Sequence, residues 1–261
     1  RAVEERGLKI VHSADDGPDA VLQGFFQDVT WHDLSEAALA IRAGALYIAT
    51  NLDLVIPRER GLMVGNGALV GAVSLSTGVK PISGGKPEPE IFLAAARGLD
   101  SRKPLAIGDN LDTDIKGAVS AGIDCLHVLT GLASARNICL APPEVRPTFL
   151  CDDMRGLNEP YPEVLIEVGD GRSRQTGDEL IDDGEEIGSG ADAKAGTVTV
   201  GSAQARWTES GVRLFGEREI DVAGGATLNL DEYRALVHAA WKAADAGADL
   251  DAAVGEITVV R

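Results

Sequence analysis

The stretch that most constrains the fold of this chain is residues 104–122. An apolar run of strand character ends there at Gly108 and leads into a turn that carries two acids, Asp109 and Asp114. An amphipathic helical pattern follows and stops at Gly122, a residue type typical of helix ends. Ligand sites in parallel α/β sheets lie at the carboxyl ends of the strands. The pattern therefore predicts a ligand site beside the two acids.

A lysine upstream of this stretch is predicted to share the site. Lys86 follows Gly84 and Gly85 in a turn ahead of a second helical pattern, and Pro87 and Pro89 suit a helix entrance. The lysine and the two acids are then expected at the same edge of the sheet. One cation and two carboxylates are the groups that a phosphate and a divalent metal need.

Segments of strand and helix character alternate through the first 150 residues. Helices are predicted at 31–44, 88–98 and 113–121, and strands at 45–49, 104–108 and 123–129. Alternation at this spacing predicts a parallel sheet covered by helices. The first helix is expected to have Asp33 as its N-cap and Glu36 as the capping-box partner. His127, inside an apolar strand, is expected to be a core residue.

Beyond residue 150 the sequence pattern changes. The acidic run at 178–186 is typical of a solvated loop. Strands are predicted at 196–200, 211–215 and 256–260, with an amphipathic helix at 230–247. These elements predict a small α+β unit to which no motif gives a role.

Composition excludes several classes of function. The chain of 261 residues has 24 Lys and Arg against 41 Asp and Glu, a net charge of −17, so it repels the backbone of nucleic acid. Its three cysteines form no Cys-x-x-Cys pair, which argues against a disulfide framework or a zinc site and favours the cytoplasm. No apolar run reaches the roughly 20 residues of a membrane span. The sequence is compatible with a homo-oligomer.

Two ordered motifs resemble a known family. Gly-Lys-Pro at 85–87, followed by Gly-Asp-Asn-Leu-Asp-Thr-Asp at 108–114, is similar to the last two motifs of the haloacid dehalogenase (HAD) superfamily. The match is to its p-nitrophenyl-phosphatase, phosphoglycolate-phosphatase and glycerol-3-phosphate-phosphatase-like branch. The resemblance implies an α/β fold: a partial α/β cap at 1–80, the second half of a Rossmann-like HAD core at 81–155, and the α+β appendage at 156–261.

The resemblance also implies roles for the site residues. A phosphatase that uses Mg²⁺ is expected, with Lys86 stabilising the charge on the phosphoryl group and Asp109 as a metal ligand. Asp114 would hold a metal-bound water or orient Lys86, and Asn110 would hydrogen-bond a metal-bound water. The alternative is a solvated turn capped by Asp112 or Thr113, which the presence of Lys86 disfavours.

A polar turn after the strand at 45–49 is the candidate substrate contact. Thr50, Asn51 and Asp53 supply hydroxyl, amide and carboxylate groups, although such residues more often only form turns. In a cap that covers the phosphate site, they favour a small phosphorylated metabolite such as glycerol phosphate or phosphoglycolate.

One family motif is absent. Members of the superfamily begin with a strand and an Asp-x-Asp pair whose first aspartate is phosphorylated, and no such pair precedes Gly84. The predicted function is that of a phosphatase whose nucleophile lies outside these residues. The alternative is a non-catalytic protein that binds a phosphorylated ligand or a partner on an inactive HAD core.

Overall fold

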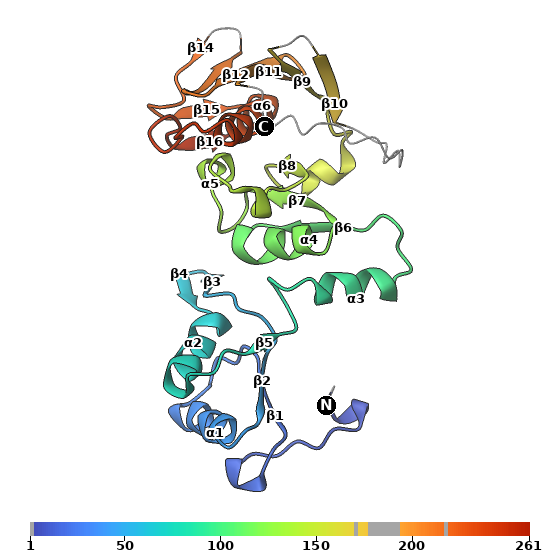
Figure 1. Cartoon of the computed structure of the whole chain (residues 1–261), viewed down its shortest axis with the longest axis vertical. Coiled ribbons are helices and arrows are strands. Elements are labelled where there is room, and N and C mark those ends of the chain that lie inside the picture. The colour runs from blue at the N-terminus through green and yellow to red at the C-terminus, as the bar shows by residue number, and fades with distance from the viewer. Residues whose placement is uncertain (1–2, 170–171, 177–193, 217–218) are drawn as a thin grey trace. The chain divides into compact units, whose positions relative to one another are not determined.

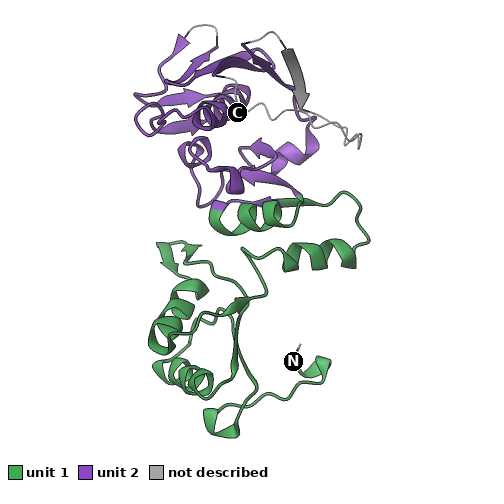
Figure 2. Cartoon of the chain, viewed as in Figure 1, with its two compact units in different colours: residues 1–106, 112–123 green, residues 107–111, 124–261 purple. Residues whose placement is uncertain are grey.

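The computed structural model describes residues 3–169, 172–176, 194–216 and 219–261 (Figure 1). It divides into two compact units (Figure 2). Unit 1 runs to residue 106 and includes 112–123, and unit 2 contains 107–111 and 124–261. The acidic run at 178–186 lies outside the described residues.

Unit 1 is built on a small parallel sheet in the order β1-β2-β5. Its elements are η1 (Glu4–Arg6), η2 (Ala14–Asp16), β1 (Ala20–Gln23), α1 (Trp31–Arg42), β2 (Leu46–Ala49), β3 (Val55–Arg58), β4 (Gly61–Val64), α2 (Asn66–Thr77), β5 (Ile82–Ser83) and α3 (Glu90–Gly98), followed after β6 by η3 (Leu111–Ile115) and α4 (Lys116–Ser120). Alternate residues of β2 are buried, and Tyr47 and Ala49 pack with Ile41 of α1 and with Val70 and Val73 of α2. The two helices therefore share one apolar core with the sheet.

The start of α1 differs from the expected one. Thr30, not Asp33, is the N-cap: its hydroxyl accepts from the Asp33 amide at 3.2 Å, and the Asp33 carboxylate accepts from the Thr30 amide at 2.8 Å. Glu36 lies outside this box and accepts hydrogen bonds from Ser13 and Ala14, which lower the pKa of its carboxyl. The prediction was wrong because Thr30 starts its own capping pair three residues before Asp33.

Unit 2 contains the rest of the core half and the carboxyl-terminal layer. Its elements are β7 (Asp124–Val128), α5 (Ala135–Cys139), η4 (Pro143–Val145), β8 (Phe149–Cys151), η5 (Met154–Asn158), β9 (Val164–Val168), β10 (Arg172–Thr176), β11 (Ala195–Val200), β12 (Ala203–Thr208), β13 (Gly211–Phe215), β14 (Glu219–Ile220), β15 (Ala226–Leu228), α6 (Leu230–Asp245) and β16 (Ile257–Val259). β6 (Leu105–Gly108), β7 and β8 form one sheet in that order, with β7 and β8 parallel. His127 of β7 is fully buried, as its apolar surroundings predict.

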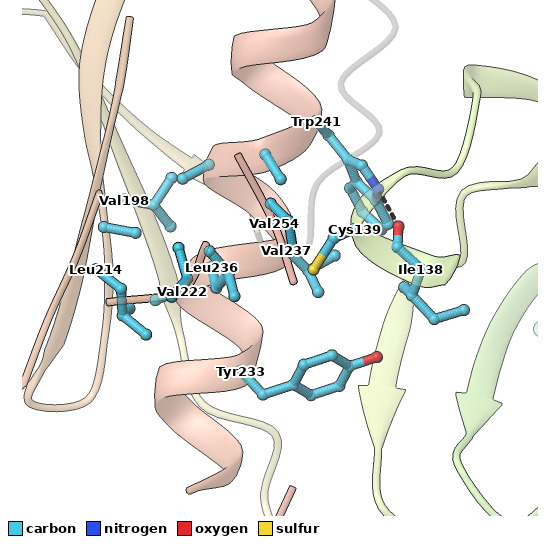
Figure 3. Packing of buried hydrophobic residues seen from close by; sticks show 14 of the residues in the cluster. Ile138, Cys139, Val198, Leu214, Val222, Tyr233, Leu236, Val237, Trp241 and Val254 are labelled. Atoms are coloured by element: carbon cyan, nitrogen blue, oxygen red, sulfur yellow. Dashed lines mark hydrogen bonds between the residues drawn. The ribbon is translucent and has the colours of Figure 1, made fainter. Parts of the chain in front are cut away.

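A six-stranded antiparallel sheet and α6 form the carboxyl-terminal layer. The sheet has the order β10-β9-β11-β12-β13-β14, and β12 alternates strictly between buried and exposed residues. The buried side carries Trp207, which belongs to the same core as α6. Leu214, on the same side, packs in this core with Tyr233 and Leu236 of α6 (Figure 3). That core extends to Ile138 and its neighbours in α5.

The fold class agrees with the prediction. The parallel core strands, with the antiparallel sheet and α6 that follow them, confirm a mixed α/β chain with a Rossmann-like half core. None of the helices in the described parts of the chain has the length and apolar character needed to cross a membrane.

Candidate active site

Lys86 is held between two carboxylates in unit 1. Its Nζ donates to Asp114 Oδ1 at 2.6 Å and lies 3.9 Å from Asp53 Oδ2. The side chains are 33%, 13% and 24% exposed for Lys86, Asp114 and Asp53, so the group is partly open to solvent. An ammonium has three donors, and the short contact with Asp114 fixes its direction. This is a charged group that can be presented to an incoming anion.

The turn at 50–53 is fixed by close backbone packing. A Cβ on Gly85 would collide with the carbonyl of Thr50, and one on Gly67 would collide with that of Leu52. Asn66 is 1% exposed, and its Nδ2 donates to the carbonyl of Asn51 at 2.9 Å. The turn is therefore packed as part of the site and is not a loose surface loop.

The same turn is joined directly to the lysine segment. The Leu52 amide donates to the carbonyl of Lys86 at 3.2 Å, and the Asn51 side chain accepts from the Asp53 amide at 3.3 Å. The peptide bond between Lys86 and Pro87 is cis. Asp53 thus sits beside Lys86 as part of one compact arrangement of backbone and charge.

Asp109 lies at the end of β6, in unit 2. Its Oδ2 accepts from the Leu132 amide at 2.8 Å, and its carbonyl accepts from the Ala133 amide at 3.0 Å. The ring Nε2 of His127 is 3.3 Å from the same carbonyl. Gly131 is required here, because a Cβ at that position would overlap the Asp109 carboxylate.

The structure groups the predicted residues into two sets. Lys86, Asp114 and Asp53 come together in unit 1, with Thr50 and Asn51 in the adjoining turn. Asp109 and Asn110 belong to unit 2. The roles assigned to all seven stay predictions.

Several residues of the site were missed from the sequence. Asn66 and its flanking glycines, Gly65 and Gly67, hold the 50–53 turn, and the backbone of Leu132 holds Asp109. The sequence did contain a signal for this contact: Asn66 has a glycine on each side and precedes an apolar run, a pattern that indicates close approach of another backbone segment. A main-chain amide leaves no such signal.

The chain supplies the right type of donor for Mg²⁺. Hard divalent cations prefer oxygen ligands such as carboxylates, and Asp109 supplies one at a strand end. Across the described ranges, no three His, Cys, Asp or Glu side chains gather in a way that could hold a metal ion. The carboxylate of Asp109 therefore fits one position of a magnesium ligand set.

The chain is similar to known phosphatases. A HAD-hydrolase-like family model matches residues 83–157. The D-glycerol 3-phosphate phosphatase of Mycobacterium tuberculosis is 44% identical over 192 residues, 70% of this chain and 54% of that protein. An acid sugar phosphatase of Staphylococcus aureus is 41% identical over 165 residues, 62% of this chain and 61% of that protein.

The chain is also similar to a phosphatase of known structure. The glycerol phosphate phosphatase of M. tuberculosis in complex with magnesium aligns with a TM-score of 0.59 and 44% identity, covering 69% of this chain and 57% of that chain. The chain thus spans little more than half the length of the first of these curated relatives.

Proposed function

Residues 83–157 belong to the HAD-hydrolase-like family, and from this we propose that the protein is a phosphatase that hydrolyses a small-molecule phosphate monoester with Mg²⁺. The observation that carries the proposal is the 2.6 Å contact between Lys86 and Asp114, which orients an ammonium beside the turn at 50–53. Its support is the 44% identity to a glycerol 3-phosphate phosphatase.

Lys86 stabilises negative charge on the phosphoryl group. Its ammonium donates to a phosphoryl oxygen, and Asp114 keeps it in place so that no reorganisation is needed as charge develops. Asp53 contributes a second carboxylate at 3.9 Å.

Asp109 would hold the metal through its carboxylate, and Asn110 would hydrogen-bond water beside it. When bound, Mg²⁺ offsets the negative charge of the phosphate. The Leu132 amide fixes one oxygen of Asp109 and so sets the orientation of the carboxylate.

The nucleophile in this proposal is an aspartate outside these residues, which forms an aspartyl-phosphate that water then hydrolyses. Its attack breaks the bond between phosphorus and the leaving alkoxide oxygen, which takes up a proton. The proposal also places the enzyme in the cytoplasm; the free, buried thiols of Cys125, Cys139 and Cys151 support this.

The substrate is a small phosphate monoester, of the glycerol phosphate or phosphoglycolate type. The turn at 50–53 supplies the hydroxyl of Thr50, the amide of Asn51 and the carboxylate of Asp53. Because Asp53 is negative, it favours a neutral polyol over a leaving group with a second carboxylate.

The test is phosphate release by the full-length protein. Glycerol phosphate, phosphoglycolate and p-nitrophenyl phosphate are assayed with Mg²⁺ and with the metal chelated. We expect turnover that depends on Mg²⁺ and is highest for glycerol phosphate. Absence of metal-dependent release from all three overturns the proposal, and ligand binding without turnover would instead indicate a non-catalytic phospho-ligand-binding protein.

A further inference from the structure

The carboxylate of Asp109 is held by a loop, residues 130–134, that follows β7. Leu132 and Ala133 donate their amides to Asp109, and Gly131 leaves room for its carboxylate. The orientation of Asp109 therefore depends on where this loop lies. The loop has its own anchors, and they come from the carboxyl-terminal layer.

Arg136 is the first anchor. It lies in α5, directly after the loop, and its Nε donates to the carbonyl of Val254 at 2.8 Å. Its Nη2 donates to both the carbonyl and the carboxylate of Asp251, each at 2.8 Å. These acceptors lie between α6 and β16. One guanidinium thus ties the end of the loop to the backbone of a distant segment.

Trp241 of α6 is the second anchor. Its indole Nε1 donates to the carbonyl of Ile138 at 2.7 Å (Figure 3). Ile138 and Cys139 are completely buried in the core shared with α6. A helix as short as α5, with five residues, has little stability of its own, so these contacts determine its position.

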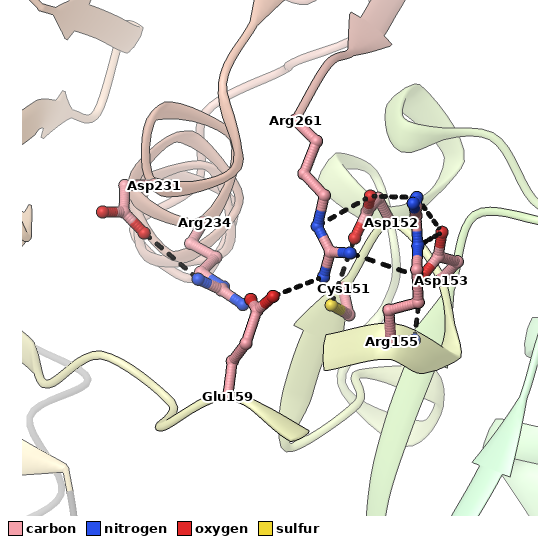
Figure 4. Close-up of polar contacts among 8 residues, drawn as sticks. All are labelled: Cys151, Asp152, Asp153, Arg155, Glu159, Asp231, Arg234 and Arg261. Atoms are coloured by element: carbon pink, nitrogen blue, oxygen red, sulfur yellow. Dashed lines mark hydrogen bonds and ion pairs between the residues drawn. The ribbon is translucent and has the colours of Figure 1, made fainter. Parts of the chain in front are cut away.

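The start of the loop is held through the segment after β8. The Leu129 amide donates to the carbonyl of Asp152 at 3.0 Å. The Asp152 carboxylate in turn lies 3.7 Å from Arg155 and 3.5 Å from Arg261 (Figure 4). In the same region, Arg234 of α6 donates to the carbonyl of Leu150 at 3.0 Å. Both ends of the loop are therefore linked to residues beyond 150.

We propose that the carboxyl-terminal layer is a brace for the loop at 130–134, and that Arg136 is a positioning residue for Asp109. This rests on the proposed function for its consequence, metal affinity, but the brace itself is a property of the fold. Arg136 does not touch the reacting atoms; it positions the loop whose Leu132 amide fixes the Asp109 carboxylate and whose Ala133 amide fixes the Asp109 backbone. Groups that orient a metal ligand in this way are worth about tenfold or more in metal affinity.

The test compares the full-length wild type with Arg136→Ala. Without metal, we expect hydrogen exchange at the Leu132 and Ala133 amides to rise about tenfold, because the anchored loop opens more often, while exchange in β7 stays unchanged. Calorimetric titration with Mg²⁺ alone should show an affinity about tenfold weaker. Arg136→Lys, which keeps the charge and loses the fork, should give an intermediate result.

Two variants serve as controls. Arg213→Ala removes an exposed arginine ion pair within the carboxyl-terminal sheet, with Glu219 at 3.7 Å, and should leave exchange at Leu132 and Ala133 unchanged. Asp251→Asn should also have little effect, since this side chain is 81% exposed and the backbone acceptors remain.

The possible outcomes distinguish the proposed brace from the proposed phosphatase activity. Unchanged exchange at the two amides in Arg136→Ala, or an equal rise in Arg213→Ala, overturns the brace. Faster exchange with unchanged Mg²⁺ affinity overturns the positioning of Asp109. If exchange and Mg²⁺ affinity change as expected but the protein releases no phosphate, the brace is supported and the proposed phosphatase activity is overturned.

Discussion

Asp109 and Asp114, five positions apart, have different partners and so different expected roles. Asp114 binds the Lys86 ammonium at 2.6 Å, whereas Asp109 is fixed by a main-chain amide. We expect Asp109→Asn to raise the Mg²⁺ concentration needed for half-maximal activity by about tenfold or more. Asp114→Asn should mainly lower kcat, because Lys86 loses the charge that directs it. Titrating phosphate release with Mg²⁺ measures both, and equal shifts in the two variants contradict the assignment.

At this scale, the sequence predicted side chains that act through charge. The order of the two motifs suggested that Asp114 could orient Lys86, and the two side chains are in contact, although β5 and β6, the strands that precede them, lie in different sheets. The contacts of Asp109 with Leu132 and of Asn66 with Asn51 could not be predicted, because one partner in each is a backbone group whose position depends on tertiary structure. The sequence carried the capping signal of Thr30, but the N-cap was predicted three residues too late, at Asp33.

The turn at 50–53 behaves as an element in its own right. It is bounded by Gly85 and Gly67, whose missing side chains allow its carbonyls to approach, and Asn66 ties it to α2. In an Asn51→Ala variant these backbone contacts remain, and the turn loses the hydrogen bond from the Asp53 amide to the Asn51 side chain at 3.3 Å. Asp53 also lies near Lys86, so Asn51 is the cleaner position for a test of specificity.

We expect Asn51→Ala to lower kcat/KM for glycerol phosphate by about threefold to tenfold, the value of one hydrogen bond, and to leave p-nitrophenyl phosphate nearly unaffected. Steady-state kinetics on both substrates give the ratio. Asn158→Ala, at an exposed asparagine in η5, is the matched control and should not change it. If the ratio of kcat/KM for the two substrates is unchanged in Asn51→Ala, the turn at 50–53 does not contribute to substrate specificity.

Elements with strong periodicity were predicted best. The helix expected at 230–247 is α6, Leu230–Asp245, and the strand expected at 123–129 is β7, Asp124–Val128. The hairpin of β3 and β4 was missed, because all residues of β4 are exposed and no apolar alternation marks it. Short strands paired by distant partners carry too little local signal.

At the scale of the whole molecule, one apolar core joins segments that the sequence pattern suggested would separate. Ile138 and Leu150 share it with Trp207 and with α6, so the carboxyl-terminal layer continues the packing of the core half. The division at residues 80 and 155 stays a prediction.

His238 links this core to pH. Burial, with smaller contributions from Lys242 and Arg234, lowers the pKa of its ring from 6.5 to about 4. Above pH 6.5 the ring is neutral in both the folded and the unfolded chain. Between pH 6.5 and about 4 only the unfolded chain binds the proton, so the free energy of unfolding falls as the pH drops through this window. Below it, the loss is complete and constant.

The expected loss from this group is about 2 kcal/mol between about pH 7 and about pH 5. Urea unfolding at both pH values measures it. His238→Phe keeps an aromatic ring against Trp241, whose centroid lies 5.2 Å from that of His238, and should lose this part of the pH dependence. His32→Gln, at an exposed histidine of α1, should keep it. If wild type and His238→Phe lose the same stability on acidification, protonation of the unfolded chain at His238 does not contribute, and the acid sensitivity belongs to the carboxylates.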